Sequence, residues 1–341
     1  MPLNSDSSGF ADYTEAVYSP RHLREGLGGG PADPGRRALF LGIAASLGLG
    51  LVACDEGDAP ETPPRGAAGG AAGAVPAATP RPGVARPRPM PSVVPVVTRR
   101  EILAEFGRRS PAQWGLDVTG VALGGPSRSV ALTFDACGGP GGSGFDRKLI
   151  RSLRRHQVPA TLFINLRWAR RNPGLLRELA TDPLFEIANH GVRHSPLSVS
   201  GRSAYGIPGT ADLGEAYDEV MGNQEGLSAL TGRAPLAFRP GTAHYDEVAA
   251  AMVRRCGLLP ANFSVNADGG ATFTPEMVAG QLDSVKGGDV VISHFNQPRS
   301  GTGEGYVAGL PGMLGRGLHF AHLSTVFGLG KAALTGVAAG R

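Results

Sequence analysis

Residues 129–323 alternate between short apolar runs and longer segments with helical periodicity. The apolar runs are rich in β-branched and aromatic residues and are bounded by Gly, Pro, Asn or Asp, which is typical of buried strands. We predict strands at 129–134, 160–164, 185–188, 236–238, 262–265, 290–293 and 319–323. The amphipathic spacing between them predicts helices at 146–156, 173–181, 213–230, 245–255 and 275–283, preceded by a short helix at 99–109.

Strands that alternate with helices imply parallel strands joined by right-handed crossovers. Six or seven such units favour an α/β fold of the distorted (β/α) barrel type, with an open doubly wound sheet as the alternative. In either architecture, binding and catalytic residues are expected where the strands end at their carboxyl edge.

The chain before residue 98 has a different character. Arg36 and Arg37 precede an apolar run that ends in Leu-Val-Ala-Cys at Cys54. The run has the length of a signal-peptide core and is short for a membrane span. The arginine pair resembles a twin-arginine export signal, and the run's end resembles a lipobox in which Cys54 is lipidated. A plain signal peptide and a short buried helix are the alternatives, and the acidic pair that follows Cys54 argues against a buried helix.

We therefore predict an exported protein, either lipid-anchored on the outer face of the cell membrane or free in the periplasm or medium. Much of the excess of glycine (52 residues) and proline (28 residues) falls before residue 98, where too little apolar surface is available to offset the entropy of ordering. The predicted organisation is an export signal (1–54), a Pro/Ala/Gly tether (55–97), a helical lead-in (98–128), a catalytic domain (129–325) and a C-terminal tail (326–341).

Charge and cysteine content exclude some classes of function. The net charge is only +4, and no basic run is interleaved with aromatic residues, so nucleic acid is not an expected partner. Three cysteines are too few for a disulfide scaffold. Cys137 follows a strand and Cys256 follows a helix, which places them at opposite ends of the predicted fold, too far apart to pair.

Polar residues stand at the ends of the predicted strands. Asp135 follows the first strand, and two histidines four residues apart, His190 and His194, follow the third. Arg239 stands before a Pro-Gly turn, where its guanidinium can be held against a carboxylate. Two neutral imidazoles suit a zinc-like ion, and a histidine at a strand end is a candidate acid. The later strand ends contribute Asp268 and His294.

These motifs in this order resemble polysaccharide deacetylases, the carbohydrate esterase family four or NodB homology domain. The resemblance rests on TFDACGG, the His-x-x-x-His pair, FRPG and VISH, and it covers about residues 130–324. It implies a distorted (β/α) barrel that hydrolyses acetyl groups on sugar polymers with the help of a divalent metal, by preference zinc.

By position, the resemblance implies a general base at Asp135, metal ligands at His190 and His194, a base-orienting arginine at Arg239 and a general acid at His294. The family's second aspartate, a metal ligand, is replaced by Ala136. The Ser or Thr that usually follows the first histidine is Gly191, which implies the loss of a hydrogen bond in the loop.

With only two histidines as ligands, metal affinity falls unless another donor joins them. Cys137 and Asp135 are the candidates, and a thiolate favours zinc. If Asp135 were a ligand, another carboxylate such as Asp268 would have to act as the base.

The predicted function is therefore metal-assisted removal of N-acetyl or O-acetyl groups from an envelope or extracellular polysaccharide such as peptidoglycan or a chitin-like polymer. A sugar-binding lipoprotein on a degenerate deacetylase scaffold is the alternative, and a hydrolase of acetylxylan or of a small cyclic amide is a third interpretation. The loops at 195–210 and 296–306 are the expected determinants of the substrate.

Overall fold

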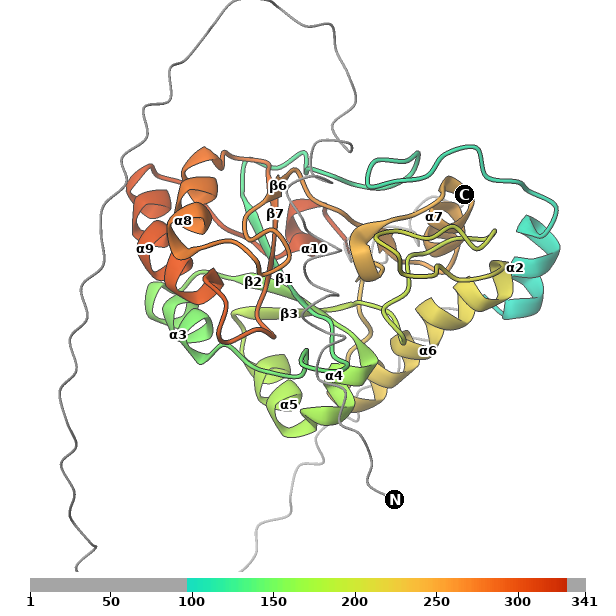
Figure 1. The fold of residues 1–341 in the computed structure, drawn as a ribbon, viewed down its shortest axis with the longest axis horizontal. Helices are drawn as coiled ribbons and strands as arrows, with labels where there is room; N and C mark the ends of the chain where they lie inside the picture. The colour runs from blue at the N-terminus through green and yellow to red at the C-terminus, as the bar shows by residue number, and fades with distance from the viewer. Residues whose placement is uncertain (1–96, 330–341) are drawn as a thin grey trace, which may run out of the picture. The chain divides into compact units, whose positions relative to one another are not determined.

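The computed structural model of the chain describes residues 97–329. Seven parallel strands form one sheet with the order β5-β4-β3-β2-β1-β7-β6. The strands are β1 (Ala131–Ala136), β2 (Ala160–Ile164), β3 (Phe185–Asn189), β4 (Ala237–Phe238), β5 (Leu259–Pro260), β6 (Val265–Asn266) and β7 (Val290–His294). The prediction of an α/β fold with parallel strands is confirmed (Figure 1).

The sheet curls because its two edge strands are neighbours in sequence. Only residues 261–264 connect β5 to β6, and an extended chain of that length spans less than about 18 Å. A flat sheet of seven strands would separate its edges by roughly 29 Å. The short connection therefore holds the sheet in the form of a distorted barrel, as predicted.

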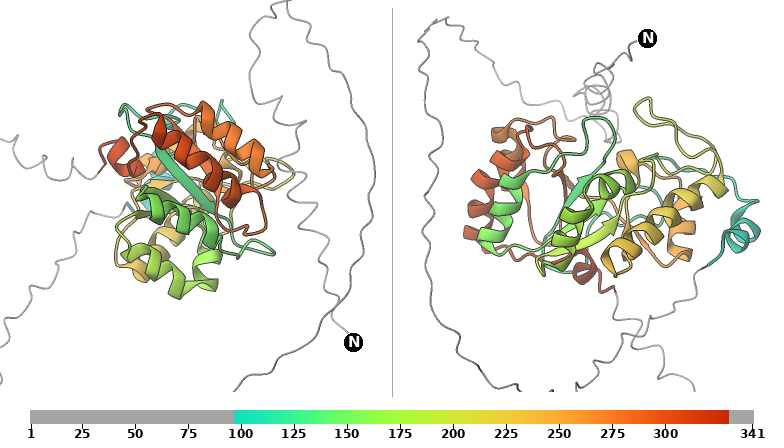
Figure 2. Two further views of the ribbon diagram at one scale, coloured as in Figure 1. Left: turned by 90° about the vertical axis from the view of Figure 1, so that its left-hand side faces the viewer. Right: turned by 90° about the horizontal axis from the view of Figure 1, so that it is seen from below.

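Helices flank the sheet: α2 (Arg99–Phe106), α3 (Arg147–His156), α4 (Leu166–Arg171), α5 (Pro173–Thr181), α6 (Leu213–Thr231), α7 (Glu247–Arg255), α8 (Pro275–Ser284), α9 (Thr302–Gly315) and α10 (Leu323–Val326), with a 3₁₀ turn at Gly241–Ala243. Side-chain caps fix several starts. Thr98 and Glu101 form a capping box at α2, and Asp146 accepts from two amides at the start of α3. Figure 2 shows α3, α8 and α9 side by side over one side of the strands.

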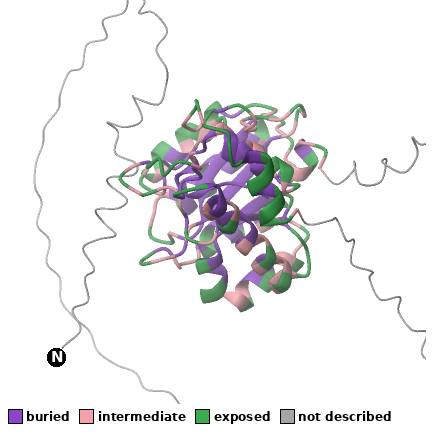
Figure 3. Cartoon of the chain, turned by 90° about the vertical axis from the view of Figure 1, so that its right-hand side faces the viewer, coloured by how far each residue is buried: buried purple, intermediate pink, exposed green. Residues whose placement is uncertain are grey.

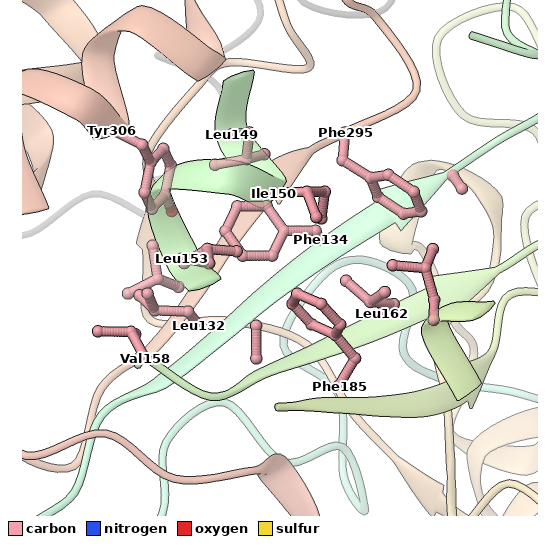
Figure 4. Packing of buried hydrophobic residues seen from close by; sticks show 14 of the residues in the cluster. Leu132, Phe134, Leu149, Ile150, Leu153, Val158, Leu162, Phe185, Phe295 and Tyr306 are labelled. Carbon is pink, nitrogen blue, oxygen red and sulfur yellow. The ribbon is translucent and has the colours of Figure 1, made fainter. Parts of the chain in front are cut away.

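The main core lies between the sheet and these helices. Leu132 and Phe134 of β1 point outward and pack against Leu149 and Leu153 of α3 (Figure 4). Phe134 also meets the ring of Tyr306 on α9, with centroids 5.1 Å apart. The central strands β1, β2 and β7 are entirely buried, whereas the outer faces of the helices are exposed (Figure 3). Because strand residues alternate between faces, residues 133 and 135 point to the opposite, inner face of the barrel.

The positions of two predicted strands were wrong. In the segment 262–265, residues 262–264 form part of the connection between β5 (Leu259–Pro260) and β6 (Val265–Asn266). In the segment 319–323 only an isolated bridge between Val130 and Phe320 forms, and helix α10 begins at Leu323. The segment 296–306, expected to be a loop, runs into α9, which begins at Thr302.

Some predictions lie outside the described residues. These are the export signal, the lipobox at Cys54 and nearly all of the tether. Within residues 97–329, no helix has the length and apolar character required to cross a bilayer.

Candidate active site

A buried ion pair stands at the centre of the inner face. Arg239, the residue after β4, donates from Nη1 to Asp135 Oδ1 at 2.7 Å and to Thr133 Oγ1 at 3.0 Å. Its Nη2 donates to the carbonyl oxygen of Asn262, and its guanidinium lies 4.1 Å from the ring centroid of Phe163. Arg239 is 0% and Asp135 only 3% exposed. These contacts leave the carboxylate with one orientation.

The surroundings of Asp135 favour its ionised form. Burial alone would raise the pKa of this carboxyl, but the charge and hydrogen bond of Arg239, with a further contribution from the charge of His294, outweigh burial and hold the pKa below its usual value. Asp135 Oδ2 also lies 3.6 Å from Nε2 of His190. The site therefore presents a fixed carboxylate that is available to accept a proton.

His190 is held in a defined tautomer. Its Nδ1 lies 2.8 Å from the carbonyl oxygen of Arg239, so Nδ1 carries the proton and donates it. The opposite nitrogen, Nε2, then has a free lone pair that faces the interior of the site. Burial lowers the pKa of His190 and keeps the ring neutral. A backbone partner on one nitrogen and a free lone pair on the other is the usual arrangement of a metal-binding histidine.

His194 is positioned by its backbone. Its φ is +68°, a left-handed conformation that few non-glycine residues adopt. Glu219 of α6, which is buried, stabilises this turn by accepting the backbone N–H groups of Arg193, His194 and Ser195. The rings of His190 and His194 meet edge to face at 4.8 Å.

Glu219 also explains Gly191, which has a φ of +76°. A Cβ at this position would lie 2.3 Å from Glu219 Oε1, so neither Ser nor Thr fits. The structure therefore gives a steric reason for Gly191, and the expected loss of a loop hydrogen bond stays a prediction.

Cys137 continues the inner face of β1. Residues 133, 135 and 137 follow the period of two of a strand, and the Sγ of Cys137 lies 3.8 Å from Nε2 of His190. Burial would raise the pKa of this thiol, but His194 and His294 lower it to about 6, which favours the thiolate. Ala136 instead points outward and belongs to the apolar core with Phe134. The methyl group is therefore not directed at the site, and the thiol is.

The donors of three residues converge. One atom each from Cys137, His190 and His194 lies within 4.8 Å of the other two. A thiolate and two neutral imidazoles are the donor types that zinc prefers, and three protein ligands leave a fourth position open, as catalytic sites require. The residues present therefore fit a zinc ion.

A second carboxylate–imidazole pair lies on β7 and the loop after β6. Asp268 accepts the backbone N–H of His294 at 2.6 Å, and its Oδ1 lies 3.1 Å from Nδ1 of His294. Thr302, at the start of α9, donates to the same carboxylate. Burial would lower the pKa of His294, but Asp268 and Cys137 raise it well above its ordinary value. Asp268 is therefore engaged in holding His294.

The barrel thus brings together all the predicted site residues that the structure describes: Asp135, Cys137, His190, His194, Arg239, Asp268 and His294. Their chemical roles stay predictions. Cys54 lies outside the described residues, and Cys137 and Cys256 are both free thiols.

The sequence analysis did not identify the polar residues of α6 that form hydrogen bonds with the segments carrying the site. Glu219 and Asn223 lie on the buried stripe of α6, where the other inward positions are apolar. Asn223 donates to the carbonyl of Ile164 and to the side chain of Asn189. Polar residues on an otherwise apolar helical stripe were the available signal, since a buried polar group needs a partner.

Comparison with known proteins agrees with the fold and the motifs. A sequence profile of the family described as "Polysaccharide deacetylase" matches residues 123–261. The chain is 26% identical over 174 residues to a chitooligosaccharide deacetylase from Bradyrhizobium sp. (strain ANU 289), covering 50% of this chain and 73% of that protein.

Solved structures share the fold. The peptidoglycan N-acetylglucosamine deacetylase Bc1960 superimposes with a TM-score of 0.53 and 23% identity, over 62% of this chain and 94% of that one. A family four carbohydrate esterase pseudoenzyme from Bacillus anthracis gives a TM-score of 0.50 and 17% identity, over 59% and 66% of the two chains. At these identities the structures establish the architecture and not the activity.

Proposed function

We propose that the chain is a polysaccharide deacetylase, a hydrolase of carbon–nitrogen bonds other than peptide bonds, which removes N-acetyl groups from an envelope or extracellular polysaccharide. One observation carries the proposal. A buried carboxylate, a buried imidazole and a Cys/His/His donor cluster meet at one end of the barrel, each held by its own partner.

The donor cluster is the proposed zinc site, with Cys137, His190 and His194 as the ligands. A divalent ion bound there supplies Lewis acidity, which polarises an acetyl carbonyl and makes a nearby water more acidic. The hydrogen bond from His190 to the backbone of Arg239 and the bonds from the His194 turn to Glu219 fix the ligands before any ion arrives.

Asp135 is the proposed general base. Its hydrogen bond with Arg239 keeps it ionised and oriented, so that it can accept a proton from an attacking water. His294 is the proposed general acid, which donates a proton to the departing sugar amine. Asp268 holds its ring in place and is itself held by a hydrogen bond from Thr302, so Asp268 acts as a positioning residue rather than as an alternative base.

The proposed substrate is an acetylated sugar polymer of the peptidoglycan or chitin type, with O-acetyl esters as a second class. We also propose that the chain is exported and retained at the membrane by a lipid on Cys54. This part rests on the sequence pattern around Arg36, Arg37 and Cys54 alone.

Acetate release from N-acetylated chitooligosaccharide and from peptidoglycan fragments tests the function. We expect turnover by the wild-type chain, loss of turnover on treatment with EDTA, and recovery with Zn²⁺ or Co²⁺. The Asp135→Asn variant keeps the shape but removes the base, so its kcat should fall by roughly 10²–10⁴-fold. Circular dichroism should show that this variant is folded.

Two outcomes would contradict parts of the proposal. Full activity after exhaustive metal removal would disprove the zinc site but not the deacetylase. Absence of acetate release from all substrates, combined with retained binding of the same sugars, would support a sugar-binding protein on this scaffold instead.

A further inference from the structure

An open hollow of about 570 Å³ lies between the loop after β1 and helix α4. Its lining comes from two sources. The glycine-rich loop after β1 contributes Gly139, Gly141, Ser143 and Gly144, and helix α4 contributes Arg167 and Arg171. We call it the arginine hollow.

The charge of the arginine hollow is not neutralised. No acidic residue is among its lining, and Arg171 makes no hydrogen bond or ion pair with any residue in the range 97–329. A second hollow, of about 360 Å³, shows the contrast. There Lys148 is paired with Glu304, and the carboxylate of Asp146 lies in the same wall. A solvent-facing cavity with two cations and no anion is suited to a negatively charged ligand.

The arginine hollow is continuous with the proposed site through Arg167. The Nη2 of Arg167 donates to the carbonyl oxygen of Cys137 at 3.0 Å, and its Nε donates to Asn165 Oδ1 at 3.2 Å. Arg167 therefore links the hollow to the strand end that carries Cys137, a member of the metal-donor cluster.

Glycine keeps the hollow open. Gly139 has a φ of +80°, and a Cβ there would lie 3.0 to 3.2 Å from the Nη1 and Cζ atoms of Arg167. A larger residue at 139 would press on the guanidinium and occupy the space beside it. The loop itself is held by Asn296, whose side-chain amide donates to the carbonyl of Gly142.

We propose that the arginine hollow is a subsite for an anionic substituent of the glycan, a carboxylate or phosphate carried next to the N-acetylated sugar. This proposal rests on the proposed function and names a class of substrate for it. Arginine suits this role because its planar fork of N–H donors matches both groups. Neutral chitooligosaccharides would be substrates without this contact, and acidic glycans would bind more tightly.

Equilibrium binding measured by calorimetry tests the proposal independently of turnover. The first pair of ligands is a glycan strand with free lactyl carboxylates and the same strand as its methyl ester. The second pair is a chitooligosaccharide and its 6-O-phosphorylated form, which distinguishes phosphate from carboxylate as the preferred source. Wild type should bind at least one anionic ligand about tenfold more tightly than its neutral counterpart, and high salt should reduce the difference.

The variants are Arg171→Gln and, as a matched control, Arg170→Gln on the same helix, where the side chain is exposed and does not line the hollow. Arg171→Gln should abolish the preference and leave affinity for the neutral ligands unchanged, whereas Arg170→Gln should keep the preference. Equal affinity of wild type for both members of both pairs, or an unchanged preference in Arg171→Gln, would overturn the proposal. Either result leaves acetate release from neutral substrate, and so the proposed function, standing.

Discussion

In the proposed metal site, Cys137 takes the place of the donor that Ala136 lacks, and the reason is the length of β1. The strand continues through Ala136, so that residue turns toward the core with Phe134 and the next residue turns toward the histidines. The sequence predicts that this segment bears the site, because an apolar run ends there. It does not show where the strand ends, and a shift of one residue exchanges the two faces.

Replacement of Cys137 tests its role as a ligand. Cys137→Ser puts a neutral hydroxyl in place of a thiolate, so zinc affinity should fall by at least about 100-fold, since even outer partners of metal sites contribute roughly 10–100-fold. Cys137→Asp restores an anionic donor and should retain more affinity than the serine variant. Competition with a chromophoric chelator measures both.

The matched control is Cys256→Ser. Cys256 caps the C-terminus of α7, its thiol lies beside Met252, and burial raises its pKa to about 11. Zinc affinity should not change in this variant. If Cys137→Ser also bound zinc like wild type, the cluster of Cys137, His190 and His194 would not be the metal site.

At position 191 both the available space and the backbone conformation disfavour a side chain. Gly191→Ser would force a Cβ to within 2.3 Å of Glu219 Oε1 in a left-handed conformation. We expect a loss of about 2 kcal/mol or more in the free energy of unfolding, measured by urea denaturation. Gly280→Ser in α8 is the control, because its Cβ would meet no atom within 4 Å. Comparable stability of the two variants would contradict this explanation of Gly191.

At the scale of elements, the long β1, β2 and β7 were predictable, and the short edge strands were not. β5 and β6 have two residues each and include Pro260 and Asn266, so they lack the apolar run on which strand prediction depends. Helix α9 was missed because Gly303, Gly305, Gly309 and Pro311 interrupt its pattern. Those glycines allow close packing: a Cβ on Gly305 would meet the side chain of Val278 at 2.4 Å.

Helix α6 shapes the site without contributing a ligand. Its Glu219 accepts three backbone N–H groups of the turn that carries His194. Burial raises the pKa of Glu219, so its negative charge is costly and is maintained by these bonds. The helix thus determines where the second histidine points, which the spacing of His190 and His194 alone does not specify.

Glu219→Gln should separate this role from general stability. The amide offers one acceptor instead of two and presents its own N–H groups to the turn, so unfolding free energy should fall by roughly 1–3 kcal/mol. Zinc affinity should fall about 10–100-fold, since the ligand loses its fixed orientation. Glu225→Gln, exposed on the same helix, should change neither. A variant at 219 that loses stability but keeps full zinc affinity would show that the carboxylate only supports the fold.

At the scale of the domain, the curl of the seven-stranded sheet explains how residues up to 159 positions apart share one site. Asp135 on β1 pairs in register with His294 on β7, and the short 261–264 connection brings the β4 end, with Arg239, round to the same face. The predicted site residues that the structure describes lie between positions 135 and 294. Cys54 lies outside the described range, and we propose that it acts on the location of the chain and not on the chemistry of the barrel.

Cys54→Ala tests that division between location and chemistry. If the Leu-Val-Ala-Cys segment is a lipobox, the wild-type chain should incorporate a labelled fatty acid and partition into the detergent phase. The Cys54→Ala variant should incorporate none and partition into the aqueous phase, while its kcat and KM on soluble chitooligosaccharide stay at the wild-type values. Cys256→Ala should remain labelled, which excludes a general effect of losing a thiol. Label retained in Cys54→Ala, or absent from wild type, would mean that the chain reaches its polymer without this anchor.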